Sequence, residues 1–116
     1  MKAFLILILA AGLASAGMAS DLDFDLVNKT SRDFEAIYIS SSAEKSWHGN
    51  LLADGRKLDP RDTLKIRFSD KETSPTWDIN IVDADGLSVA FDDVKLAGAQ
   101  RIILTESEGK LVATVE

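Results

Sequence analysis

Residues 77–91 read Trp-Asp-Ile-Asn-Ile-Val-Asp-Ala-Asp-Gly-Leu-Ser-Val-Ala-Phe, and this stretch decides the fold. Apolar and polar residues alternate through 77–82 and again through 87–91, which is the two-residue period of a strand with one buried face. The intervening segment 83–86, Asp-Ala-Asp-Gly, has the aspartate and glycine content of a tight turn. The stretch therefore predicts a β-hairpin whose inward side chains are Trp77, Ile79, Ile81, Leu87, Val89 and Phe91.

The same two-residue period recurs on both sides of the hairpin, at 21–28, 36–40, 63–68, 101–105 and 110–115. Turn-forming residues separate these segments, and none has the 3.6-residue period of a helix. We therefore predict an all-β domain of about seven short strands in a two-sheet immunoglobulin-like sandwich, with a partly closed small β-barrel as the alternative. The predicted core contains the inward residues of 77–91 except Leu87, together with Phe24, Leu26, Ile37, Ile39, Leu64, Ile66, Phe68, Ile102, Leu104 and Val112.

Residues 1–19 have a different character from the rest of the chain. Lys2 precedes an unbroken apolar run, and small residues follow around Ala16 and Ala19. This is the pattern of a secretory signal peptide, and the run is shorter than the roughly 20 residues that span a bilayer. We expect cleavage after Ala16 or Ala19, which leaves one domain, 20–116, in the periplasm or secreted, with no membrane span.

The expected mature chain is acidic and has no cysteine. Without Lys2, 12 of the 13 basic residues remain against 19 acidic ones, a net charge of −7, so we expect no nucleic acid partner. Asp21, Asp23 and Asp25 form an acidic stripe on the first strand, which we interpret as the solvated face of an edge strand. The lack of cysteine excludes disulfides, a cysteine-linked lipid anchor, thiol catalysis and cysteine-bound zinc within this sequence.

Five short segments follow one another along the chain: Leu-Val-Asn-Lys-Thr (26–30), Ile-Tyr-Ile-Ser-Ser-Ser (37–42), Ser46-Trp47, Thr-Leu-Lys-Ile-Arg-Phe (63–68) and the first ten residues of 77–91. Their order resembles that in a group of small exported, periplasmic bacterial β proteins of unknown function. Members of this group often carry the name argininosuccinate lyase. An authentic argininosuccinate lyase is a long, mostly helical chain with active sites between subunits, so the resemblance implies an exported β domain and supplies no catalytic residue.

The acidic turn is the candidate metal site. Asp83 and Asp85, with Asp92 and Asp93 downstream, offer carboxylates at the close spacing that calcium prefers. On the EF-hand template, however, the first ligand position falls on Ile81, and strands flank the loop where helices belong. We therefore interpret the segment as a hairpin turn, keep a calcium-stabilised domain as the alternative, and predict no cofactor.

No catalytic constellation is visible, so we predict a non-enzymatic protein. His48 is the single histidine, and Ser41 and Ser42 lie nearby in sequence without a nucleophile motif around them. We interpret His48 as an exposed loop residue, and a small hydrolase or lyase is the least favoured alternative.

The irregular segment 41–61 holds the candidate partner-binding residues, Trp47, Leu51 and Leu52. A tryptophan and two leucines among serine, glycine and asparagine form either a binding patch or a cap that folds back over the sandwich. The predicted function is thus a binding or structural module for an unknown protein or cell-envelope component, with its oligomeric state left open.

Overall fold

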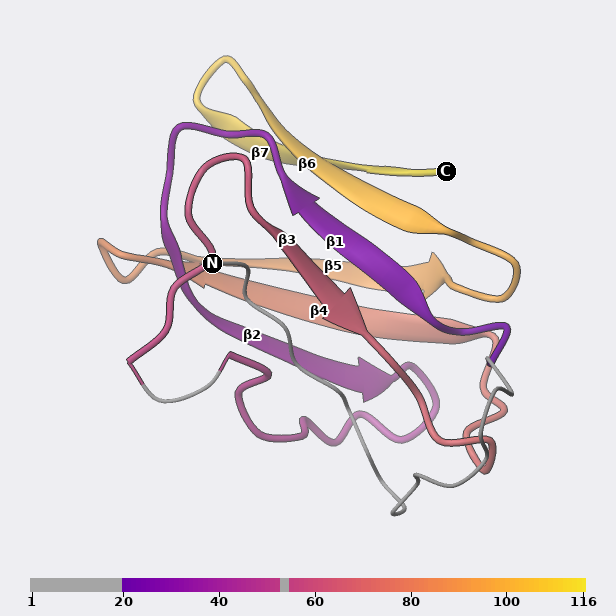
Figure 1. Ribbon diagram of the computed structural model, residues 1–116. Coiled ribbons are helices and arrows are strands. Elements are labelled where there is room, and N and C mark those ends of the chain that lie inside the picture. Colours follow the sequence, from indigo (N-terminus) through magenta and orange to yellow (C-terminus); the bar gives the residue numbers. More distant parts are fainter. Residues whose placement is uncertain (1–19, 53–54) are drawn as a thin grey trace.

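The computed structural model describes residues 20–52 and 55–116, which form seven β-strands in two sheets (Figure 1). The predicted all-β, two-sheet sandwich of about seven strands is confirmed. The predicted signal peptide, residues 1–19, lies outside the described residues. The strands are β1 (Phe24–Asn28), β2 (Phe34–Ser41), β3 (Thr63–Ile66), β4 (Thr76–Asp83), β5 (Ser88–Lys95), β6 (Arg101–Ser107) and β7 (Lys110–Val115).

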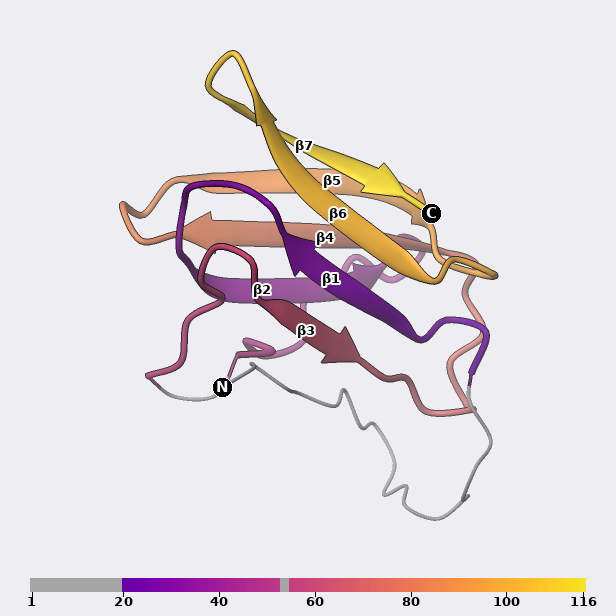
Figure 2. The same ribbon diagram turned by 45° about the horizontal axis from the view of Figure 1, so that its top comes forward.

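The two sheets lie in two layers (Figures 1 and 2). One sheet has the order β3-β1-β6-β7 and the other the order β2-β4-β5. All neighbouring strands are antiparallel except β1 and β6, which are parallel. The alternative of a partly closed barrel is not observed, because no strand of one described sheet pairs with a strand of the other. The likeness to an immunoglobulin domain lies in the layers and strand number, since the strand order is different.

A single apolar core fills the space between the sheets. Trp77 is fully buried, and its ring meets that of Phe68 edge-on, with centroids 5.0 Å apart. Phe68 in turn lies 6.3 Å from Phe24, so one line of aromatic rings joins the two layers. Twelve of the 15 predicted core residues are buried, and Val89 and Phe91 are partly buried and pack against the same cluster.

Two predicted inward residues, Val112 and Leu87, face solvent instead. In β7 the inward residue is Leu111, which is buried, whereas Val112 is 38% exposed. The prediction was wrong because both faces of this strand carry apolar residues, so the two-residue period did not distinguish them. Leu87 is 60% exposed because it belongs to the turn, where its amide binds the Asp83 carboxylate.

Several core residues lie outside the alternating segments and were therefore missed. Phe34 begins β2 and exchanges two backbone hydrogen bonds with Leu58, which is also fully buried. A lone leucine in a polar loop has no periodic neighbours, so its burial depends on contacts distant in sequence. Leu51, Leu52 and Leu96 also lie outside these segments, whereas the missed core residues Leu22, Ala36 and Leu111 lie within them.

The predicted edge position of the first strand was wrong. β1 lies between β3 and β6, and its Asp25 is 3.7 Å from the Arg67 guanidinium. The parallel pairing with β6 joins segments about 75 residues apart and leaves no local signal. The predicted end of the fifth strand at Phe91 was also too early, because β5 continues to Lys95.

Within the described residues, no helix has both the length and the apolar character to cross a membrane.

Candidate functional site

The segment that joins β2 to the rest of the chain, residues 42–52, is called here the Trp47 loop. It runs back along the outer edge of β2, where the amides of His48 and Leu51 donate to the carbonyls of Ile39 and Ile37 at 3.1 and 2.8 Å. The loop therefore satisfies edge groups of β2 that would otherwise be open to another strand.

Asn50 fixes the loop against the same edge. Its Oδ1 accepts from the amides of Ile37 at 2.9 Å and Leu52 at 3.0 Å, and its Nδ2 donates to the Glu35 carbonyl at 3.2 Å. One side chain thus replaces part of a missing strand. No motif in the sequence distinguishes this asparagine from the other polar residues of the loop.

The three predicted partner-binding residues fall in two different environments. Leu51 and Leu52 are buried in the core, with 4% and 3% of their surface exposed. Trp47 keeps 47% of its surface exposed. The leucines therefore anchor the loop in the core, and of the three residues only Trp47 offers a large apolar surface to solvent.

A buried carboxylate, Asp78, holds the start of the Trp47 loop. Its Oδ1 accepts from the Ser42 hydroxyl at 2.8 Å and from the Asp93 amide at 3.0 Å, and its Oδ2 lies 3.5 Å from Lys45 Nζ. The Ser46 amide, next to Trp47, donates to the buried Ser40 hydroxyl at 2.6 Å. Asp78 is a polar position of the alternating stretch 77–82, so the alternation predicts that it lies on the outer face of the sheet. The alternation does not predict that it is buried there.

The backbone segments that contact Asp78 depart from regular strand geometry. Trp77 pairs with Val94 but Ile79 pairs with Phe91, so β5 has one residue more than β4 here and forms a β-bulge. Asp93 in this bulge has φ of 56°, and Lys45 has φ of 53°, both in the left-handed region that non-glycine residues adopt at some cost. At Asp93, the hydrogen bond from its amide to Asp78 Oδ1 favours this backbone conformation.

The same contacts make Asp78 a poor base. The hydrogen bond from the Asp93 amide, then those from Ser42 and the charge of Lys45, hold the Asp78 pKa below its usual value, against the opposing effect of burial. A carboxylate with a lowered pKa does not draw a proton from the Ser42 hydroxyl that it binds. The arrangement is therefore a structural brace for the loop.

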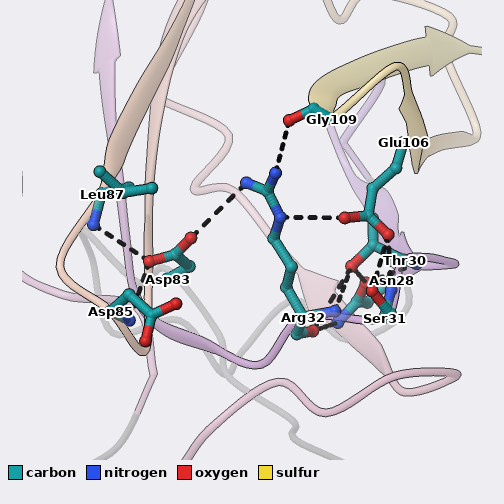
Figure 3. A network of polar contacts seen from close by, with 9 residues as sticks. All are labelled: Asn28, Thr30, Ser31, Arg32, Asp83, Asp85, Leu87, Glu106 and Gly109. Atoms are coloured by element: carbon teal, nitrogen blue, oxygen red, sulfur yellow. Dashed lines mark hydrogen bonds and ion pairs between the residues drawn. The ribbon is translucent and has the colours of Figure 1, made fainter.

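A second polar network closes the opposite end of the sandwich, around Arg32 (Figure 3). Its Nε donates to Glu106 Oε2 at 3.0 Å, Nη2 donates to the Gly109 carbonyl at 2.7 Å, and Nη1 lies 3.5 Å from Asp83 Oδ2. One guanidinium thus ties the β1–β2 connection to the β4–β5 turn and to the β6–β7 hairpin. Hydrogen bonds from Ser31, reinforced by Arg32, hold the Glu106 pKa below its usual value.

The four carboxylates of the candidate metal site do not converge. Asp83 binds the amides of Asp85 and Leu87 at 2.9 and 3.0 Å through Oδ1, while Oδ2 faces Arg32. These contacts are those of the predicted hairpin turn. Asp92 and Asp93 lie about five residues further along β5, roughly 16 Å away at strand spacing. Over residues 20–52 and 55–116, no three acidic or histidine side chains form a metal-binding group.

His48 lies in the Trp47 loop as predicted but is half-buried instead of exposed, because its amide belongs to the β2 edge pairing. Asp23 of the predicted acidic stripe also has structural partners, because its carboxylate accepts from the Phe68 amide at 2.7 Å and from the Ser20 amide at 3.1 Å. Comparison of the chain with protein-family models, with curated proteins and with solved structures found no match.

Proposed function

We propose that this protein is an exported, non-enzymatic binding module that recognises a partner protein or a cell-envelope component through Trp47. The observation that carries the proposal is that Trp47, 47% exposed, lies between two anchored amides. The Ser46 amide binds Ser40 Oγ at 2.6 Å, and the His48 amide binds the Ile39 carbonyl at 3.1 Å. Because the backbone on both sides of Trp47 is fixed, its indole offers a large contact area with little loss of backbone entropy on binding.

The surroundings of Trp47 support recognition rather than packing. The part of the loop before Trp47 is held by Asp78, which lies 3.5 Å from Lys45, and the part after it is held by two buried leucines, Leu51 and Leu52. The loop is therefore anchored on both sides of Trp47, while the indole faces solvent. Exposed tryptophans on ordered segments are frequent energetic centres of protein interfaces. Export is proposed from the signal-peptide pattern of residues 1–19, which places the partner outside the cytoplasm.

The non-enzymatic part of the proposal rests on how the polar groups of the described residues are used. The guanidinium of Arg32 and the carboxylates of Asp78 and Asp83 are each occupied by internal partners. Side chains held in this way stabilise loops and are not free to act on a substrate.

Site-specific photo-crosslinking tests this proposal. A benzoylphenylalanine replaces Trp47 in one variant and Leu87 in a matched control, because Leu87 is also exposed but lies in the β4–β5 turn at the far end of the sandwich. Irradiation in the producing cells should give a discrete adduct from position 47 and not from position 87. Absence of an adduct at position 47, or the same adducts from both positions, would contradict a Trp47-centred interface.

A further inference from the structure

The sandwich has two long open edges among its described residues, β5 and β7, and only β5 is protected. The bulge, Asp92, Asp93 and Lys95 make β5 a poor template for another strand. β7 pairs with β6 in an unbroken register and contains neither proline nor a bulge. It also carries two of the four exposed large hydrophobic side chains of the described chain, Val112 and Val115.

The free backbone groups of β7 belong to alternate residues. Glu116 exchanges hydrogen bonds with Arg101, its amide donating at 2.9 Å and its carbonyl accepting at 3.3 Å. In an antiparallel pair such doubly bonded positions recur every second residue, so the even-numbered residues of β7 face β6. The amides and carbonyls of Leu111, Ala113 and Val115 therefore point outward, away from β6.

We propose that a second copy of this chain adds to β7, with the two β7 strands antiparallel about a two-fold axis at Ala113. Centring at an odd-numbered residue joins outward-facing groups to each other, so Ala113 pairs with the partner subunit's Ala113 and Leu111 with the partner subunit's Val115. The two four-stranded sheets then become one sheet of eight strands. Such a self-complementary contact is the usual form of a two-fold dimer.

The side chains of this register match in chemistry. Lys110 lies opposite the partner subunit's Glu116 at both ends of the interface, and Val112 lies opposite the partner subunit's Thr114 on the outer face. Charges already alternate across the existing sheet, because Lys65, Asp25, Arg101 and Glu116 occupy one row over β3, β1, β6 and β7. The partner subunit's Lys110 adds a positive charge next to Glu116 and continues that alternation.

The neighbouring registers bring less favourable side chains opposite each other. With the two-fold axis at Val112, Glu116 lies opposite the partner subunit's Glu108, and like charges directly opposite are destabilising. With the axis at Thr114, Glu116 lies opposite the partner subunit's Val112, and its charge loses a matching partner. The proposed dimer is independent of Trp47, which lies beside β2 in the other sheet.

Sedimentation equilibrium of the protein and of three variants tests the dimer. The protein should associate as its concentration rises, and Lys110→Glu should weaken association at least tenfold by placing two glutamates opposite each other at both ends. The double variant Lys110→Glu/Glu116→Lys restores both intersubunit pairs but removes the ion pair of Glu116 with Arg101 Nε at 2.8 Å, so it should associate more tightly than Lys110→Glu. Ala113→Pro should abolish association because it removes a central outward amide, while its β6 pairing groups stay intact.

Circular dichroism shows whether each variant is folded. Because Lys110→Glu changes an exposed side chain, we expect at least this variant to fold and to decide the test. A mixture of Lys110→Glu and Glu116→Lys should form a heterodimer, since each chain then supplies the charge that the other lacks. A monomer at all concentrations up to about 1 mM would overturn the proposal. A dimer whose affinity in Lys110→Glu and in Ala113→Pro equals that of the unsubstituted protein would also overturn it.

Discussion

The two tryptophans allow the core to be tested by a matched pair of substitutions. Trp77 is fully buried, contacts Phe68 edge-on and donates from Nε1 to the Ser74 carbonyl at 2.7 Å, whereas Trp47 is 47% exposed. An indole buries about 200 Å². At about 25 cal/mol per Å², this burial is worth about 5 kcal/mol. Measured costs of Trp→Ala in cores are about 3–5 kcal/mol, and we expect Trp77→Ala to fall in that range.

The assay is urea unfolding followed by far-ultraviolet circular dichroism. With an m-value of about 1.5 kcal/mol/M, Trp77→Ala should lower the midpoint by about 2–3 M, a large part of the total stability of such a domain. If the alanine variant does not fold, Trp77→Phe gives a smaller but measurable loss because it keeps most of the apolar contact. Trp47→Ala should change stability by less than about 0.5 kcal/mol. Equal losses from Trp77→Ala and Trp47→Ala would refute the assigned core.

Two further predictions concern the β4–β5 pair. Asp78→Ala should cost about 2 kcal/mol at neutral pH, because it leaves the Ser42 hydroxyl and the Asp93 amide without their acceptor. Since the folded-state pKa of Asp78 is lowered, its contribution is fully present above about pH 4 and is lost as the pH falls through the folded-state pKa. Unfolding curves of wild type and variant should therefore converge in acid, and a constant difference would contradict the proposed role. In the second prediction, Thr76→Cys/Lys95→Cys should form a disulfide, because these residues are directly opposite and the neighbouring Leu96 amide bonds the Pro75 carbonyl at 3.1 Å, which makes the pair non-hydrogen-bonded and close. Oxidation should raise stability by about 3 kcal/mol relative to the reduced variant, and thiols that stay free under oxidised glutathione would show that the register is wrong.

Local pattern was sufficient for the strands but not for their arrangement. The hairpin at 77–91 was predictable because its alternation and its turn chemistry lie within fifteen residues. The parallel pairing of β1 with β6 was not, because it depends on contacts between distant segments. In β7, the faces were exchanged because Leu111 and Val112 are both apolar, so alternation alone assigns neither face.

The candidate site was predictable only in part, for a similar reason. Trp47 was singled out because a large apolar residue in a polar loop requires an explanation, and the structure places it on the surface. Leu51 and Leu52 carry the same local signal, yet both are buried. The brace that fixes the loop joins Asp78 to Ser42, 36 residues earlier, through a bulge in β5. No local pattern of residues indicates such a contact.

Native mass spectrometry of the full-length gene product, purified from the cells that produce it, most directly tests recognition through Trp47. Wild-type protein should carry an additional component, whose mass identifies a partner protein or an envelope molecule, and a second copy of the chain is recognised by its own mass. Trp47→Ala should lose that component while remaining folded, as shown by its unchanged unfolding midpoint. A wild-type protein without any bound partner, or a Trp47→Ala variant that retains the partner undiminished, would contradict recognition through Trp47.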